Sequence, residues 1–378
     1  MTKKEIVIAP GDVVTRAQIR EVFGGSAQGG ICPSVEMQSV NLFSDPSVGE
    51  KLGYYDGWLA EDDDLGPVFE YTGAGMSGNQ TFEGVAGAGN RAILKHAEQG
   101  RALRTFTQVG KVPGSGTKTH KYLGEFSLDR LQPYAWRQIH GADGRDRNVV
   151  VFRLRPDGEV QRSEKDIIPP AEETTAELVP FTVVTAAMLQ SAPATGGALS
   201  QPKQRRKKPS SRSKPVNAAT SGTFVVPESF NTRMSLRSAT ASFIAVRREA
   251  ELTQAYKDYL ESLGHTVGAF QIKVRGLSST LRTDLYDATD HILYEVKGAS
   301  AREDVRMALG QLLDYSRYVS TEAHPGSPKR IILLPSAPDT DMYDLCERYE
   351  VGLIHRSESG KFTVGSNPLE GSKVCPAP

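Results

Sequence analysis

The sequence has few cysteines and no long apolar segment. Its 378 residues include only three cysteines, Cys32, Cys346 and Cys375, and no Cys-x-x-Cys pair. This argues against a disulfide-rich domain and against a four-thiolate zinc site. No apolar run reaches the roughly 18 residues that a membrane span needs, and residues 1–12 lack the apolar core of a signal peptide. We therefore expect a cytoplasmic protein that does not use a membrane.

An excess of charge of either sign is also missing, because 45 basic residues balance 45 acidic ones. A net charge of zero does not exclude a nucleic-acid partner, since the positions of the charges matter. Acidic residues are absent from residues 178–227, and seven positive charges lie within residues 203–214. Such a segment buries too little apolar area to offset its ordering entropy. We interpret residues 161–225 as a flexible basic linker, either a solvated tether or one that holds DNA loosely through phosphates.

The length fits two domains at roughly 100–200 residues each, and the linker separates residues 1–160 from residues 226–378. The first part is rich in glycine and short strand-like runs, so it predicts a mostly β domain. Strands are expected there at residues 68–71 and 148–154, with a helix at 90–99. The second part predicts an α/β domain. Helices are expected at residues 245–264 and 302–319, and strands at 269–274, 291–297, 331–334 and 351–355.

Aromatic, acidic and glycine residues gather between Tyr54 and Asn79. A pocket for an extruded DNA base needs two aromatic walls and an acceptor for the base edge. Trp58, Tyr71 and the acidic cluster Asp62–Asp64 could supply these parts. The alternative is that the rings belong to a core and the acidic turn is solvated.

The order of these residues resembles the SRA (SET and RING associated) domain, a barrel-like α+β module that flips modified cytosine out of duplex DNA. The resemblance rests on Phe69-Glu-Tyr71-Thr-Gly-Ala-Gly-Met-Ser-Gly-Asn79 and Gly89-Asn90-Arg91, and it covers about residues 24–156. It implies that Tyr71 stacks on the base, that Asp62 reads the cytosine edge and that Asn79 contacts DNA. The second stacking wall is Trp58 or Leu59. Thr81 stands where the family has an arginine, and the choice between 5-methylcytosine and another modification stays open.

A second group of residues lies around Asp284 and Glu295-Val-Lys297. On an extended strand Leu293, Glu295 and Lys297 point to one face, because side chains alternate. Two carboxylates at such a corner can hold Mg²⁺, and a lysine beside them can stabilise charge on a phosphate. A solvated Glu/Lys pair is the alternative. The helices on either side favour the first interpretation: Glu249 is on the apolar face of one, and Gln311 and Tyr315 are one turn apart on the other.

Together these elements resemble the PD-(D/E)XK nuclease superfamily, in its restriction-endonuclease branch, over about residues 247–355. The resemblance implies that Asp284 and Glu295 bind Mg²⁺, with Mn²⁺ able to substitute, and that Lys297 assists the attacking water. Glu249 would support the metal site, and Gln311 would orient the site or contact substrate. Thr283 stands at the proline of the family name.

The two resemblances together predict a modification-dependent restriction endonuclease, of the kind used in phage defence. It would bind double-stranded DNA that carries a modified base, cut outside that base at a variable offset, and act as a homodimer on DNA. Three alternatives remain: a repair or recombination nuclease without modification preference, a non-catalytic DNA-binding module, and a reader of another signal such as phosphorothioate or N6-methyladenine.

Overall fold

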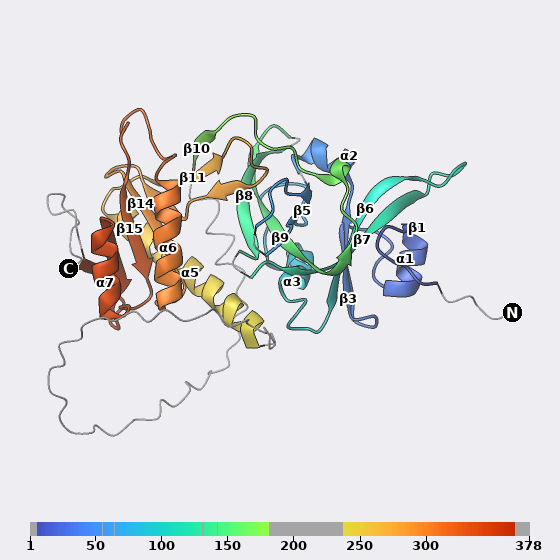
Figure 1. The fold of residues 1–378 in the computed structure, drawn as a ribbon, viewed down its shortest axis with the longest axis horizontal. Helices are drawn as coiled ribbons and strands as arrows, with labels where there is room; N and C mark the ends of the chain where they lie inside the picture. The colour runs from blue at the N-terminus through green and yellow to red at the C-terminus, as the bar shows by residue number, and fades with distance from the viewer. Residues whose placement is uncertain are drawn as a thin grey trace, which may run out of the picture. The chain divides into compact units, whose positions relative to one another are not determined.

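The computed structural model describes residues 6–54, 56–63, 65–130, 132–141, 143–180 and 237–366. These residues belong to one compact unit. Within them, nine strands form one sheet and eight strands form a second, separate sheet (Figure 1). The boundary between the two sheets falls after residue 168, as the elements below show.

The first sheet has the strand order β2-β3-β6-β7-β9-β5-β4, with β1 paired to β7 and β8 paired to β9. Its strands are antiparallel except for the parallel pair β3–β6. The strands are β1 (Val13–Thr15), β2 (Ile31–Ser34), β3 (Ser39–Ser44), β4 (Gly57–Trp58), β5 (Phe69–Thr72), β6 (Ala102–Lys111), β7 (Lys118–Leu128), β8 (Tyr134–His140) and β9 (Asp146–Val160). The helices are α1 (Arg16–Phe23), α2 (Pro46–Gly49), η1 (Glu50–Leu52), α3 (Ala88–Leu94) and η2 (Glu164–Asp166).

Alternation along the strands builds the core of this first sheet. On β9, Val150, Phe152 and Leu154 are two residues apart and all enter one buried cluster with Trp58 and Tyr71. The helix α1 begins at a capping box, in which the Thr15 hydroxyl and the Gln18 side chain each accept a backbone N–H of the other residue. The first sheet is therefore a mostly β domain with its aromatic residues inside.

The second sheet has the strand order β10-β11-β13-β14-β15-β16-β17, with β12 paired to β11. The pairs β14–β15 and β15–β16 are parallel. The strands are β10 (Thr175–Pro180), β11 (Val267–Lys273), β12 (Thr280–Arg282), β13 (Leu285–Asp287), β14 (Ile292–Val296), β15 (Lys329–Leu334), β16 (Val351–Arg356) and β17 (Phe362–Ser366). The helices are α5 (Arg237–Ser262), α6 (Arg302–Tyr315) and α7 (Thr340–Arg348), and no described helix is long and apolar enough to cross a membrane.

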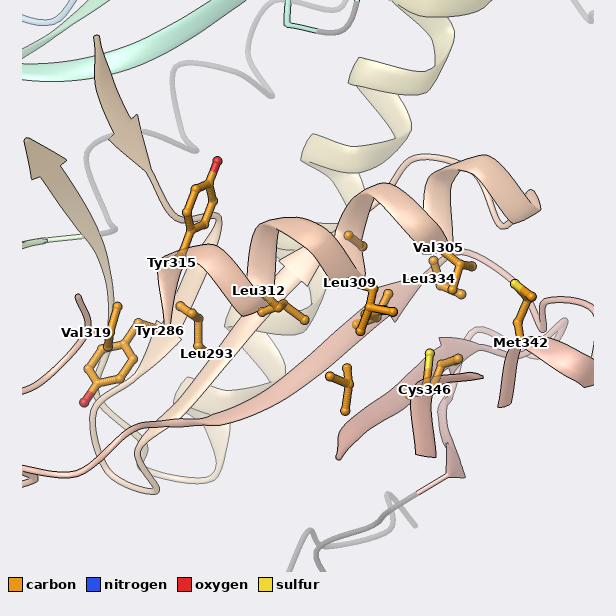
Figure 2. Packing of buried hydrophobic residues seen from close by; sticks show 14 of the residues in the cluster. Tyr286, Leu293, Val305, Leu309, Leu312, Tyr315, Val319, Leu334, Met342 and Cys346 are labelled. Atoms are coloured by element: carbon orange, nitrogen blue, oxygen red, sulfur yellow. The ribbon is translucent and has the colours of Figure 1, made fainter. Parts of the chain in front are cut away.

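Helices cover both faces of the second sheet. Residues of α6 and α7 share one buried cluster with Leu293 of β14, whereas residues of α5 share another with Tyr294, the next residue of the same strand. Figure 2 shows Leu309 and Leu312 of α6 within the first of these clusters. This three-layer arrangement is the α/β pattern that the sequence predicts.

Most of the predicted elements are present. The strands predicted at residues 68–71 and 148–154 correspond to β5 and to part of β9, and the strand at 291–297 corresponds to β14. The helices predicted at 90–99 and 302–319 are shorter than expected, because α3 ends at Leu94 and α6 at Tyr315. Helix α7 was not predicted.

The linker predicted at residues 161–225 starts too early, because its first residues form regular structure. Residues 164–166 form η2, and β10 pairs antiparallel with β11 from Thr175 to Pro180. Residues 175–180 gain backbone hydrogen bonds by pairing with the open edge of β11. The basic composition of the residues that follow does not predict this pairing. The rest of the predicted linker, residues 181–225, lies outside the described residues.

Candidate active site and cavity

The second sheet brings Asp284, Glu295 and Lys297 together. Glu295 and Lys297 are 2% and 8% exposed, and the Lys297 Nζ lies 2.5 Å from Glu295 Oε1. Asp284 lies between β12 and β13, and its Oδ2 accepts the backbone N–H of Val296 at 2.8 Å. That bond ties the aspartate to the end of β14, so the three predicted residues form one group, in which Glu295 and Lys297 are buried and Asp284 is partly buried.

Burial and mutual repulsion dominate the electrostatics of this group. Burial raises the pKa of Glu295 well above its usual range, and the neighbouring Asp284 raises that pKa further. Burial likewise raises the pKa of Asp284, which the Lys297 ammonium opposes. The pKa of Lys297 is raised because three carboxylates, Glu295, Asp284 and Glu249, outweigh the effect of its burial. The site thus contains three acidic groups, against the Lys297 ammonium and the Arg282 guanidinium beside Asp284.

Glu249 joins the group from α5, although that helix covers the other face of the sheet. Its pKa is raised to about 8, chiefly by burial and then by the charge of Asp284, while Lys297 and the backbone N–H of Gly298 lower it. These partners place its carboxylate at the same end of β14 as Lys297. The predicted inward direction of Glu249 is therefore explained by charged partners.

Gln311 and Tyr315 of α6 face each other, as their spacing predicts. Gln311 Nε2 donates to the Tyr315 hydroxyl at 3.5 Å, and the buried Gln311 Oε1 has no partner among the described residues. Burial raises the pKa of Tyr315 to about 12, with the charge of Glu295 as the next cause. In Figure 2 the Tyr315 hydroxyl points away from the aliphatic side chains of α6. Gln311 is thus bonded to Tyr315, whose hydroxyl feels the charge of Glu295, and its buried oxygen keeps one acceptor free.

The chemistry of this donor set fits a hard divalent cation. Carboxylate oxygens are the ligands that Mg²⁺ prefers, and here they are buried with an excess of negative charge. A bound cation would relieve the repulsion that raises the carboxyl pKa values. Asp284 and Glu295 are the residues that would hold it, with Glu249 beside them.

A second group of metal-ligating side chains has a structural explanation. His265, Asp287 and Asp290 bring their ligand atoms within 4.8 Å of one another. Asp287 Oδ2 lies 2.6 Å from His265 Nδ1, and its Oδ1 accepts the backbone N–H groups of Thr289 and Asp290. These bonds close the turn between β13 and β14, which accounts for the cluster without an ion.

In the first sheet, the two rings predicted to stack on a base are enclosed. Trp58 is 0% exposed and packs edge-on against Phe69 at a centroid distance of 5.4 Å. The Tyr71 hydroxyl donates to the carbonyl of Gly30 at 2.8 Å, and its ring is 3% exposed. A base could enter between these rings only by displacing core side chains, so both belong to the core in this structure.

Asp62 and Asn79 lie apart from those rings. The Asp62 side chain is 48% exposed, and its carboxylate pairs with Arg162 at 2.9 Å. Arg162 also lies 5.7 Å over the Trp58 ring, which makes it the link between Asp62 and the core. Asn79 Oδ1 accepts the backbone N–H of Asn148 at 2.9 Å, in the loop that follows β5. The structure thus does not gather the four predicted residues into one pocket.

A cavity of about 270 Å³ opens beside them. That volume is near the lower end of the roughly 300–1,000 Å³ of ligand pockets, so it suits a small planar group. Tyr54 and Phe69 supply aromatic surface, Asp56 supplies a carboxyl group, and consecutive residues 165–169 form one wall. Trp58 packs directly behind Phe69 and so supports this wall without lining it.

Two polar groups of the cavity stand out. Asp56 has a raised pKa, and the Thr107 hydroxyl lacks a hydrogen-bond partner among the described residues. Burial raises the pKa of Asp56, and Glu70 raises it further, although the Thr72 N–H donates to Asp56 Oδ1 at 2.8 Å. The buried Thr107 hydroxyl has no partner within the described part of the chain. Tyr54 accepts Arg147 NH2 at 2.5 Å and donates to the Gly75 carbonyl, which joins the cavity to the loop that carries Asn79.

The sequence analysis missed Tyr54, Asp56 and Thr107. The first two lie in the aromatic and acidic stretch that it singled out, but the neighbouring Trp58 and Asp62 matched the expected spacing better. Thr107 lies on β6, about fifty residues further along the chain, and only the folded sheet brings it there. Gly73, in the same stretch, allows a close approach of the backbone, since a Cβ there would meet Asn90 Oδ1 at 2.6 Å.

Comparison with protein families assigns this first domain. The family model described as "ScoMcrA-like, SRA domain" matches residues 10–170. Residues 10–170 are an SRA domain of the ScoMcrA type. This SRA domain spans the first sheet and ends with the residues that wall the cavity. No curated protein matches the chain.

Solved structures show likeness at low identity. The type IV phosphorothioation-dependent restriction endonuclease ScoMcrA shares 23% identity at a TM-score of 0.29, over 42% of this chain and 29% of that one. An SRA domain of SUVH5 bound to fully methylated CG DNA shares 18% identity at 0.27, over 41% and 93%. The DNA modification-dependent restriction endonuclease AspBHI shares 14% identity at 0.28, over 38% and 68%. Since this chain spans under a third of ScoMcrA, the activity of that whole protein does not transfer directly.

Proposed function

We propose that the protein is a modification-dependent DNA endonuclease. Its SRA domain would hold an extruded, modified base, and its second domain would hydrolyse phosphodiester bonds as a PD-(D/E)XK nuclease. The observation that carries the proposal is the buried group of Asp284, Glu295 and Lys297, because an ion pair crowded by further carboxylates is costly unless it has a task.

Each residue of the second site has a role in this proposal. Asp284 and Glu295 hold Mg²⁺, which when bound acidifies water and offsets charge on the phosphate. Lys297 is positioned to stabilise the negative charge that develops on a phosphate oxygen. Glu249 supports the metal site. Gln311 is a positioning residue, because its described partner is Tyr315.

For the SRA domain we propose that the cavity receives the base. Tyr54, which is partly exposed, provides a ring for stacking, which is favourable for any base, and the buried Phe69 forms part of the cavity wall. Asp56 is suited to the edge of cytosine, because its carboxyl oxygens can accept a hydrogen bond from the N4 amino group. In this assignment Asp56 takes the role predicted for Asp62, and Tyr54 takes the role predicted for Trp58. The pocket still has an aromatic ring and an acceptor, as base flipping requires.

The partner in this proposal is double-stranded DNA, and a homodimer on DNA would supply the two active sites that a double-strand break needs. The modification is the open part of the proposal. Relatives of the SRA domain include proteins whose structures hold methylated or phosphorothioated DNA, and both signals are therefore candidates. A repair nuclease with the same second site would cut all these DNAs alike.

The test is cleavage of plasmids of one sequence that carry 5-methylcytosine, N6-methyladenine, phosphorothioate or no modification, with and without Mg²⁺. We expect Mg²⁺-dependent cutting of one modified plasmid in preference to the others. Lys297→Ala should lower that rate about 10²–10³-fold, as the loss of one charge-stabilising group does, while DNA binding persists. Lys273→Ala, an exposed lysine on β11, is the matched control and should cut normally. Cutting by Lys297→Ala at the parental rate would refute the nuclease assignment, and equal cutting of all plasmids would refute the modification dependence.

A further inference from the structure

The chain passes from the SRA domain to the second sheet within four residues. Ile168 belongs to the first domain, where it packs with Leu59 and Val68 and its N–H donates to the Trp58 carbonyl at 2.8 Å. Ala171 is bonded to the loop between β11 and β12 of the second sheet: its N–H donates to the Leu277 carbonyl at 2.8 Å. Pro169 and Pro170 are the residues between them.

The residues after Ala171 stay attached to the second sheet. The Ala171 carbonyl accepts the N–H of Gly276 at 2.9 Å, and the Thr174 hydroxyl accepts the N–H of Arg275 at 3.0 Å. β10 then begins at Thr175 and pairs with β11 along its whole length. The described chain therefore has no long unattached segment between its two sheets.

The basic segment, residues 181–236, has a different place in the topology. It begins after β10 and ends before α5. β10 is a strand of the second sheet, and α5 covers that same sheet. Both ends of the basic segment thus belong to one domain, and its length does not separate the two domains.

Two consecutive prolines make a short and stiff connection. Each proline ring fixes φ near −65°, and a residue before proline is restricted to extended conformations. Two residues span at most about 7 Å, because an extended chain covers roughly 3.3–3.6 Å per residue. Pro169 is at the same time part of the cavity wall, so the connection starts at the proposed base pocket itself.

We propose that the Pro169–Pro170 joint sets the distance between the recognised modification and the cut. This rests on the proposed function. The flexible tether that the sequence suggests would spread the cuts over many positions, whereas the joint confines them to a narrow window at a fixed offset. Pro169 and Pro170 are then specificity-determining residues of the reaction, and of the two only Pro169 lines the proposed base pocket.

The experiment uses a duplex with one centrally placed modification, and it maps the cut ends at single-nucleotide resolution. The parental protein should give one narrow window. Six Gly/Ser residues inserted between Pro169 and Pro170 should broaden or shift that window by several nucleotides. The same six residues inserted between Gly196 and Gly197, within the basic segment, form the matched control and should leave it unchanged. A broad window in the parental protein, or an effect of the second insertion alone, would overturn the proposal.

A measurement without cleavage separates this proposal from the proposed function. Spin labels on Val109→Cys and Glu358→Cys, both exposed, report the distribution of distances between the domains. Cys375 is replaced by Ser, and the native Cys32 and Cys346 are buried. The distribution should be narrow in the parental protein and broad after insertion at the joint. If the protein cuts no DNA but its distance distribution broadens after the insertion, the nuclease proposal is refuted and the proposal of a stiff Pro169–Pro170 joint stands. If the distribution of the parental protein is already broad, only the joint proposal is refuted.

Discussion

The carboxylate group of the second sheet and the cavity of the SRA domain both enclose acidic groups, but with different neighbours. Glu295 lies among Asp284, Glu249 and one lysine, so its surroundings carry excess negative charge. Asp56 accepts the backbone N–H of Thr72 and is bonded to the side chains of Thr72 and Ser44, with Glu70 as its acidic neighbour. Crowded carboxylates are stabilised by a cation, whereas a carboxyl group among hydrogen-bonding and aromatic groups suits a hydrogen-bonded neutral ligand.

The largest effect that tests this contrast is expected from Glu295→Gln. The amide keeps the shape of the side chain but weakens the cation site, so the cleavage rate should fall about 10²–10³-fold, and half-maximal cutting should need more Mg²⁺. Cleavage would be measured across a series of Mg²⁺ and Mn²⁺ concentrations. Glu347→Gln, exposed on α7, is the control and should match the parental protein. An unchanged Mg²⁺ requirement in Glu295→Gln would show that this carboxylate holds no metal.

A smaller effect is expected at the cavity. Asp56→Asn loses a hydrogen-bonding carboxyl group, which should cut the preference for the modified duplex about 10- to 100-fold. Asp62→Asn breaks only a partly exposed ion pair with Arg162, and such pairs contribute about 0–1 kcal/mol. Gel shifts with duplexes that differ in one modification would compare the two variants. The reverse result, with Asp62→Asn the more damaging, would restore the assignment made from the sequence.

The smallest effect concerns a buried histidine of the SRA domain that has no catalytic role here. Burial, with Arg16 and Lys118 nearby, lowers the pKa of His120 to about 4. Because its unfolded pKa is near 6.5, its contribution is fully present above pH 6.5 and is lost as the pH falls towards 4. At pH 5.5 the folded state should lose about 1.4 kcal/mol relative to pH 7.5. Thermal unfolding at both pH values checks this, and His120→Gln should remove that part of the pH difference.

The two sites also differ in how far the sequence predicts them. Glu295 and Lys297 are two residues apart on one strand, so alternation alone places them together, and a single turn brings Asp284 to the same end. The cavity gathers Tyr54, Thr107 and residues 165–169 from separate segments, and no local period records such contacts. Trp58 and Tyr71 have the residue types of a base pocket, yet apolar burial places them in the core.

The domain boundary, like the cavity, depends on contacts between distant segments of the chain. The basic composition of residues 203–214 predicts a linker, but it does not predict which sheet residues 175–180 join. β10 is assigned by backbone pairing with β11, and six consecutive partners form that pairing. A composition-based boundary therefore fell inside a domain, because backbone pairing depends little on side-chain type.

The edge position of β10 has a practical consequence for anyone who wishes to purify the second domain alone. A fragment that begins at residue 226 would lack β10 and leave the backbone groups of β11 unpaired at the border of the sheet. Exposed edges of this kind recruit strands from other molecules, and such a fragment should aggregate. A fragment that begins at Ala171 retains its own protective strand, and we expect it to stay monodisperse.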